Sequence, residues 1–201
     1  MSAELAAPLW LASASPRRRA LLAGVGVAFR VEPSRADELR RPGEAPESFV
    51  TRAASDKAAE VQRRCAPEAG SAFVLGADTV VVCGESVLGK PRDDAHAREM
   101  LGALSGARHR VVTGVSIWSG GEECGHICCT SALRFRALSE QEITRYIALG
   151  EGQDKAGAYA VQGVAAGFVA GLEGSYSNVV GLPLAETLEL MRRVGLLRAW
   201  P

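Results

Sequence analysis

The run FVLGADTVVV (residues 73–82) constrains the fold of this chain more than any other stretch. It is long, apolar and rich in β-branched residues, which predicts a buried strand or a pair of strands. Asp78 lies at its centre, and a buried carboxylate is costly unless a cation neutralises it. We therefore expect a metal ion or a lysine beside Asp78. A sharp turn at GADT, capped by Asp78, is the alternative, and the β-branched residues that follow make it less favoured.

Helical and strand-like patterns alternate along the first half of the chain, and strands pair in the second half. Runs with strand character occupy residues 8–13, 28–34, 73–82, 110–118 and 124–135. Segments with helical spacing occupy residues 16–24, 49–64, 93–106, 139–149 and 184–197. A Gly-Gly turn between the last two strand runs predicts a hairpin, and SEQE (139–142) is a capping box. Residues 36–48 are polar and rich in Pro and Gly, which predicts a loop. The patterns together predict a mixed α/β chain.

The charge balance and the cysteines disfavour several classes of protein. Lys plus Arg (23) equals Asp plus Glu (23), whereas a bulk nucleic-acid binder needs a basic surface. We expect no membrane segment, since no apolar run reaches the roughly 20 residues of a span, and the N-terminus lacks a signal-peptide pattern. Five irregularly spaced cysteines do not suggest disulfides, so we expect a cytoplasmic setting. In CGHICC (124–129), a strand with cysteines packed as small hydrophobes is favoured over a zinc site.

The stretch SASPRRR (13–19) begins a helix with an unexpected charge. Ser15 suits the N-cap and Pro16 the first helical position, yet three arginines follow where the helix dipole prefers acidic side chains. A phosphate at this N-terminus would resolve the conflict, because free backbone N–H groups and arginine side chains would then face an anion. The residues expected to bind it are Ser13, Ser15, Arg17 and Arg18. Arg19 is expected to be solvated.

Two lysines lie in unusual settings. Lys57 falls on the apolar stripe of the helix predicted at residues 49–64, so it either reaches outward to solvent or faces a lined cavity. Lys90 lies between Gly89 and Pro91, where the backbone is restricted, although a single turn lysine of this kind is usually just exposed. Together with the arginines and Asp78, the lysines suit phosphoryl chemistry, in which cations neutralise a polyphosphate and a carboxylate holds a metal or activates water.

Four blocks of the sequence resemble the Maf family of nucleotide pyrophosphatases. They are LASASPRRRALL, GADTVVV, LGKP and DKAGAYAVQG…GSYSNVVGLPL, and the match runs from about Leu11 to Leu190. The resemblance implies a single domain over residues 1–201, with a mixed twisted sheet, flanking helices and two lobes around a deep cleft, similar to the inosine-triphosphate pyrophosphatases. It also implies cleavage of a nucleoside triphosphate between the α and β phosphates, with a divalent cation, Mg²⁺ or Mn²⁺, as cofactor.

The resemblance assigns roles to individual residues. Asp78 is the implied proton acceptor, and Lys57 and Lys90 join the serines and arginines of the first block in binding phosphate. An acidic position after the second strand corresponds to Asp37 or Glu38 here. The implied metal ligands are Asp78, Glu38 and Asp154.

Three further positions are implied to set substrate choice, namely Arg17, Thr79 and Gln162. This trio resembles the dTTP and UTP pyrophosphatase branch of the family. Gln162 offers both a donor and an acceptor, which suits the O4 and N3–H edge of uracil or thymine. The alternatives are a 7-methyl-GTP type of pyrophosphatase and a nucleotide-binding regulator of septum formation with little or no turnover. A nucleoside triphosphate is the expected partner and a homodimer is plausible by resemblance, whereas nucleic acid and membrane are not expected.

Overall fold

The computed structural model describes residues 2–65 and 71–200. Residue contacts cluster into two compact units. The first unit comprises Met1–Asp78, Thr113–Cys129 and Gly181–Pro201, and the second comprises Thr79–Val112 and Thr130–Val180. Three long strands contribute residues to both units; they are β4 (Phe73–Cys83), β6 (Arg108–Ser119) and β7 (Glu122–Phe135).

The other elements belong to one unit each. The first unit holds β1 (Glu4–Leu5), β2 (Leu9–Leu11), α1 (Pro16–Gly24), β3 (Arg30–Val31), α2 (Pro46–Arg64), α7 (Leu184–Arg193) and β9 (Leu197–Ala199). The second unit holds β5 (Ser86–Leu88), α4 (Asp94–Leu104), α5 (Glu140–Ala148), the short 3₁₀ turns η1 (Ala156–Ala158) and η2 (Val164–Phe168), β8 (Val169–Glu173) and α6 (Tyr176–Val180). Among the described residues no helix is both long and apolar enough to cross a membrane.

The main sheet is mixed. Its strand order is β3-β2-β4-β6-β7-β8, and β5 adds to β4 off this path. Strand β2 runs parallel to β3 and β4, whereas the pairs β4–β5 and β7–β8 are antiparallel. Strands β1 and β9 form a separate antiparallel pair. The prediction of a mixed α/β fold is confirmed, with six α-helices in the described part of the chain.

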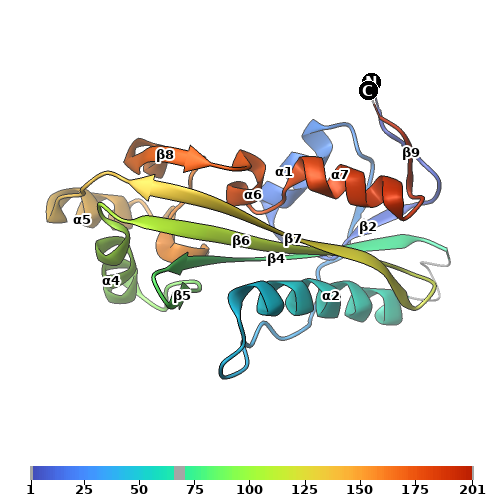
Figure 1. Ribbon diagram of the computed structural model, residues 1–201, viewed down its shortest axis with the longest axis horizontal. Helices are drawn as coiled ribbons and strands as arrows, with labels where there is room; N and C mark the ends of the chain where they lie inside the picture. Colours follow the sequence, from blue (N-terminus) through green and yellow to red (C-terminus); the bar gives the residue numbers. More distant parts are fainter. Residues whose placement is uncertain (1, 66–70, 201) are drawn as a thin grey trace. The chain divides into compact units, whose positions relative to one another are not determined.

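In the first unit both faces of the sheet are covered by helices (Figure 1). Leu9 and Leu11 of β2 pack in a core cluster with residues of α1 and α7. The intervening Trp10 packs on the opposite face with Ala58 and Val61 of α2. Successive side chains of a strand point to opposite faces, so β2 and β4 must be apolar on both. Strand β4 accordingly continues without a break through GADT, and the alternative of a sharp turn there is wrong.

Several elements with local sequence signals form where they were predicted, and two differ in their bounds. Gly120 and Gly121 have φ of +62° and +90° in the β6–β7 turn, a backbone conformation that glycine adopts at no steric cost. The capping box of α5 forms, with Ser139 and Glu142 bonded to each other's backbone N–H groups. Helix α2 begins at Pro46 instead of residue 49, because proline suits the first helical turn. The strand expected at residues 28–34 shortens to Arg30–Val31.

The cysteines of CGHICC lie in β7 but not in the core. Cys124 and Cys128 are exposed and Cys129 is half-buried, which contradicts their expected packing as small hydrophobes. Strand β8 pairs with β7 only from Ala132 to Phe135, so β8 does not extend beside the cysteines. The five cysteines are free thiols.

Candidate active site

Helix α1 begins directly after β2, and its first turn carries the predicted anion-binding residues. Ser15 is the N-cap, and its Oγ accepts a hydrogen bond from the backbone N–H of Arg18 at 3.4 Å. Ser13 is buried, and its Oγ accepts the N–H of Ser15 at 3.2 Å. Arg17 is half-buried and Arg19 is exposed. This turn contains no acidic side chain, so the partial positive charge of the helix start can attract an anion.

Arg18 is held across the fold of the first unit. Its Nε donates to the carbonyl oxygen of Gly181 at 2.8 Å, and its Nη1 donates to Ser13 Oγ at 3.2 Å. Burial lowers the pKa of Arg18, and the nearby carboxylates of Asp78 and Glu38 partly oppose that shift. Arg18 is half-buried, and a guanidinium keeps its proton in proteins, so Arg18 is a cation at the start of α1. Gly181 lies inside the last family block, GSYSNVVGLPL, but no local signal in the sequence indicates that its carbonyl would bind Arg18.

Helix α2 lies unusually close to the sheet, and two glycines permit this. A Cβ built on Gly76 of β4 would lie 2.1 Å from the backbone oxygen of Ala54, and one on Gly114 of β6 would lie 2.3 Å from that of Val50. Real Cβ atoms do not approach a backbone oxygen so closely. The small side chains of α2 on this face, Ala53, Ala54 and Ala58, are buried. The backbone of α2 therefore contacts the strands directly, so a side chain of α2 spans a shorter distance to reach a group on the sheet.

Lys57, on this same helix, reaches the carboxylate embedded in β4. Its Nζ donates to Asp78 Oδ1 at 2.5 Å, and both residues are 6% exposed. The same Nζ lies 2.7 Å from Glu38 Oε1, on the loop before α2. Lys57 therefore points into the protein, and it is the cation that was expected beside Asp78. Of the two acidic candidates, Asp37 and Glu38, the structure pairs Glu38 with Lys57. A buried pair of this kind is costly to desolvate, which points to a role beyond stability.

The carboxylates of this cluster suit a divalent cation shared with a substrate. Mg²⁺ is usually held by one or two carboxylates plus substrate phosphates, and Asp78 and Glu38 meet at one ammonium group. No group of three or more His, Cys, Asp and Glu side chains gathers as a metal cage within residues 2–65 and 71–200. Asp78 and Glu38 are two carboxylates, a number that fits an ion whose other ligands are phosphate oxygens.

The remaining predicted residues belong to the second unit. Thr79 follows Asp78 on β4 and is half-buried. Lys90 is exposed, and the carbonyl of the preceding Gly89 accepts the N–H of Gly157 at 3.0 Å. This bond joins the LGKP block to the DKAGAY block. Asp154, in the latter, is exposed and pairs with Lys155 at 2.5 Å.

Gln162 is exposed on a loop that two side chains hold. Tyr146 Oη accepts the N–H of Ala160 at 2.9 Å, and Glu151 Oε2 accepts the N–H of Val164 at 3.0 Å. Tyr146 and Phe168 belong to a cluster of edge-to-face rings that also includes Phe135, Tyr159 and His109. The Gln162 loop is thus held on one side by a tyrosine of this packed core and on the other by Glu151, outside the core.

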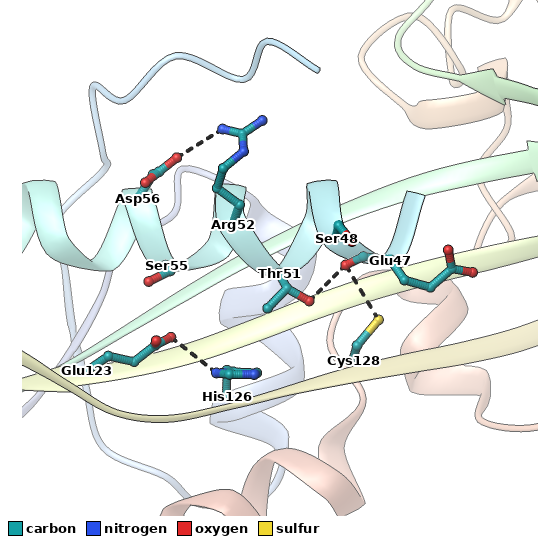
Figure 2. A pocket seen from close by; sticks show the side chains of 9 residues that line it. All are labelled: Glu47, Ser48, Thr51, Arg52, Ser55, Asp56, Glu123, His126 and Cys128. Atoms are coloured by element: carbon teal, nitrogen blue, oxygen red, sulfur yellow. Dashed lines mark hydrogen bonds and ion pairs between the residues drawn. The ribbon is translucent and has the colours of Figure 1, made fainter. Parts of the chain in front are cut away.

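A separate groove lies in the first unit between α2 and β7 (Figure 2). Its volume is about 490 Å³, and its lining residues are Glu47, Ser48, Thr51, Arg52, Ser55, Asp56, Glu123, His126 and Cys128. Glu123 lies 3.5 Å from His126, and Arg52 lies 3.1 Å from Asp56. None of the predicted site residues lines this groove, which therefore differs from the Arg18 and Lys57 cluster.

Known proteins match the chain over nearly all of its length. A family model described as Maf-like protein matches residues 8–194. The dTTP/UTP pyrophosphatase of Anaeromyxobacter sp. (strain Fw109-5) is 50% identical over 196 residues, which cover 96% of this chain and 92% of that protein. The proteins of that name from Syntrophotalea carbinolica and Myxococcus xanthus are 48% and 49% identical, and the alignments cover 94% and 96% of this chain and 85% and 95% of theirs.

A solved structure is also similar, although distantly. The nucleoside-triphosphatase, or dITP/XTP pyrophosphatase, of Mycobacterium abscessus aligns with a TM-score of 0.39 and 16% identity, covering 65% of this chain and 75% of that one. A score this low adds nothing to the fold described above.

Proposed function

Because the chain belongs to the family of Maf-like proteins, we propose that it hydrolyses dTTP and UTP to the nucleoside monophosphate and pyrophosphate. Curated relatives about 50% identical to it are named dTTP/UTP pyrophosphatases. The observation that carries the proposal is the cluster of the first unit, where a buried Lys57–Asp78 pair meets Glu38 and lies in the electrostatic field of Arg18. This is the charge pattern that a metal-bound polyphosphate requires.

In the proposed mechanism, the start of α1 binds the phosphates. Ser13, Ser15, Arg17 and Arg18 supply donors and positive charge, and Lys57 and Lys90 add cations. The hydrogen bond to Gly181 and the contact with Ser13 fix the Arg18 side chain before substrate arrives, so little ordering is required on binding. The cations stabilise the charge that develops on the leaving pyrophosphate.

Asp78 is the proposed general base. Lys57 holds its Oδ1, which fixes the carboxylate orientation, and the other oxygen accepts a proton from the water that attacks the α-phosphorus. Asp78 and Glu38 would hold a Mg²⁺ or Mn²⁺ ion, with Asp154 a further candidate. A bound divalent ion supplies neutralisation of phosphate charge and alignment of the triphosphate.

The choice of base is assigned to Arg17, Thr79 and Gln162. Gln162 is exposed, so its amide is accessible, and the two fastenings of its loop keep it in place. The five free thiols support the proposal of a reducing compartment, the cytoplasm. A homodimer is proposed by resemblance alone.

The test is pyrophosphate release from UTP and dTTP with Mg²⁺ or Mn²⁺, comparing the native protein with Asp78→Asn. The variant should fold and bind nucleotide but lose about 10²–10⁴-fold in kcat, the usual contribution of a general base. Asp37→Asn, on an exposed neighbour of Glu38, is the control and should retain activity. Turnover by Asp78→Asn close to native would remove Asp78 as the base. Nucleotide binding without metal-dependent release in the native protein would favour the septum-regulator alternative.

A further inference from the structure

The segment that carries Glu38 runs from Glu32 to Ala45 and contains no helix or strand. We call it the Glu38 segment. It is long for a connection inside a compact unit, and loops of this length need side-chain contacts to stay in one conformation. Three cations of α2, Arg52, Lys57 and Arg64, contact the Glu38 segment along its length.

Arg64 holds the beginning of the segment. Its Nη1 donates to Glu32 Oε1 at 2.6 Å and its Nη2 donates to the Pro33 carbonyl at 2.9 Å. Its Nε donates to Glu60 at 2.6 Å, and the other oxygen of Glu60 accepts the N–H of Arg35 at 3.1 Å. These contacts end three residues before Glu38.

Arg52 holds the segment on the far side of Glu38. Its Nε and Nη2 form a two-point ion pair with Glu44 at 2.7 and 2.8 Å, and Nη2 also donates to the Leu39 carbonyl at 3.0 Å. Its Nη1 donates to Asp56, as Figure 2 shows. Glu44 in turn accepts the N–H of Arg41 at 2.9 Å, and hydrogen bonds from Arg52 and Arg41 lower its pKa to about 2. The Glu44 carboxylate is therefore ionised whenever the protein is folded near neutral pH.

Packing does not hold the chain at this point. The Leu39 side chain is 76% exposed, so no apolar burial fixes the residue next to Glu38. The Glu38 side chain is itself 47% exposed, and an ion pair so open to solvent contributes little by itself. The Leu39 carbonyl, which accepts a hydrogen bond from Arg52, belongs to the residue next to Glu38. The ion pair with the largely buried Glu44 side chain keeps Arg52 in position.

We propose that Arg52 is a positioning residue for the reaction, which fixes the Glu38 carboxylate beside Lys57 and Asp78 without touching the substrate. The inference rests on the proposed function, because it gives Glu38 a part in the site. Arginine is suited to this task, since its planar fork binds a carboxylate at two points while a further N–H reaches a carbonyl.

A double-mutant cycle tests the proposal with Arg52→Gln, Glu38→Gln and the two combined. Arg52→Gln should lower kcat/KM for UTP about tenfold in the native background and less than about twofold in the Glu38→Gln background, because coupled residues are not additive. Arg64→Gln is the matched control. Like Arg52, Arg64 is an arginine of α2 that binds two carboxylates, one of them in an i,i+4 ion pair, and its side chain has a similar exposure, 23% against 22%. Its effect should be the same in both backgrounds.

Amide hydrogen exchange gives a second readout that does not depend on activity. Arg52→Gln should speed exchange in residues 36–44, whereas Arg64→Gln should speed it mainly in residues 32–35. Additive effects of Arg52→Gln and Glu38→Gln in an active enzyme, or unchanged exchange in residues 36–44, would overturn the proposal. A native protein that releases no pyrophosphate would instead refute the proposed function, and exchange alone would then decide whether Arg52 holds the segment.

Discussion

The contact between Gly76 and helix α2 makes a prediction whose size follows from the structure. In Gly76→Ala the new Cβ would lie 2.1 Å from the Ala54 oxygen and 2.9 Å from the Ala58 nitrogen, and both are backbone atoms. Ordinary contact begins at 3.4 Å, so the helix must retreat by the difference between 2.1 and 3.4 Å. Overpacking of this kind costs about 1–3 kcal/mol. For a chain of this length a loss of about 2 kcal/mol lowers Tm by roughly 4–8 °C.

The same retreat should move Lys57, which precedes Ala58 on the helix, away from Asp78. A displacement of about 1 Å in a catalytic arrangement can cost about 10²-fold in rate. We therefore expect kcat/KM for UTP to fall about 100-fold in Gly76→Ala at temperatures where the variant is folded. Thermal unfolding followed by circular dichroism and pyrophosphate release at 25 °C measure the two effects.

Gly171→Ala is the control for this experiment. It makes the same substitution in a strand, β8, where the new Cβ would meet only the Arg134 side chain at 3.9 Å. Both its Tm and its activity should stay near native. If Gly76→Ala also melts and turns over like the native protein, then the close approach of α2 does not govern the Lys57–Asp78 contact.

Two more predictions concern buried charge. Lys57→Met leaves the Asp78 carboxylate buried without its partner, so the free energy of unfolding measured with urea should fall by about 3–5 kcal/mol. Adding Asp78→Asn should restore part of that loss. Equal stability of the single and double variants would contradict this. Burial lowers the pKa of His109 from 6.5 to about 4, so between these values the unfolded chain binds the proton and the folded one does not. The free energy of unfolding should therefore fall as the pH drops through this window, by up to about 3 kcal/mol, and His109→Gln should flatten the dependence measured between about pH 7.5 and about pH 5.

The elements that could be predicted from the sequence are those with local signals. The glycine pair of the β6–β7 turn, the capping box at Ser139 and the Ser15–Pro16 start of α1 each encode their own geometry. The need for a cation beside Asp78 could also be predicted, because burying a carboxylate in an apolar strand is costly unless a cation neutralises it. The sequence alone left open whether that cation was a metal or a lysine.

Tertiary contacts decided what local signals could not. Lys57 and Asp78 are 21 positions apart, and their contact depends on two glycines that let a helix settle on the sheet. The prediction that the cysteines of β7 are buried was wrong because a local pattern shows that a segment is a strand but not which of its faces other elements cover. Arg52 gave no signal, since an arginine four residues before an aspartate on a helix is an ordinary surface pattern.

The two arginines that fasten the Glu38 segment also limit how this stretch of chain can vary in length. Arg64 marks one attachment at Pro33 and Arg52 marks another at Leu39. An insertion between these points would change the number of residues that must fit a fixed span, and it would shift Glu38 out of register with Lys57. Residues 40–43 lie beyond Leu39 and before Glu44, where Gly43 already makes a turn with φ of +73°. Evolution can therefore lengthen the turn at residues 40–43 far more freely than the few residues that precede Glu38.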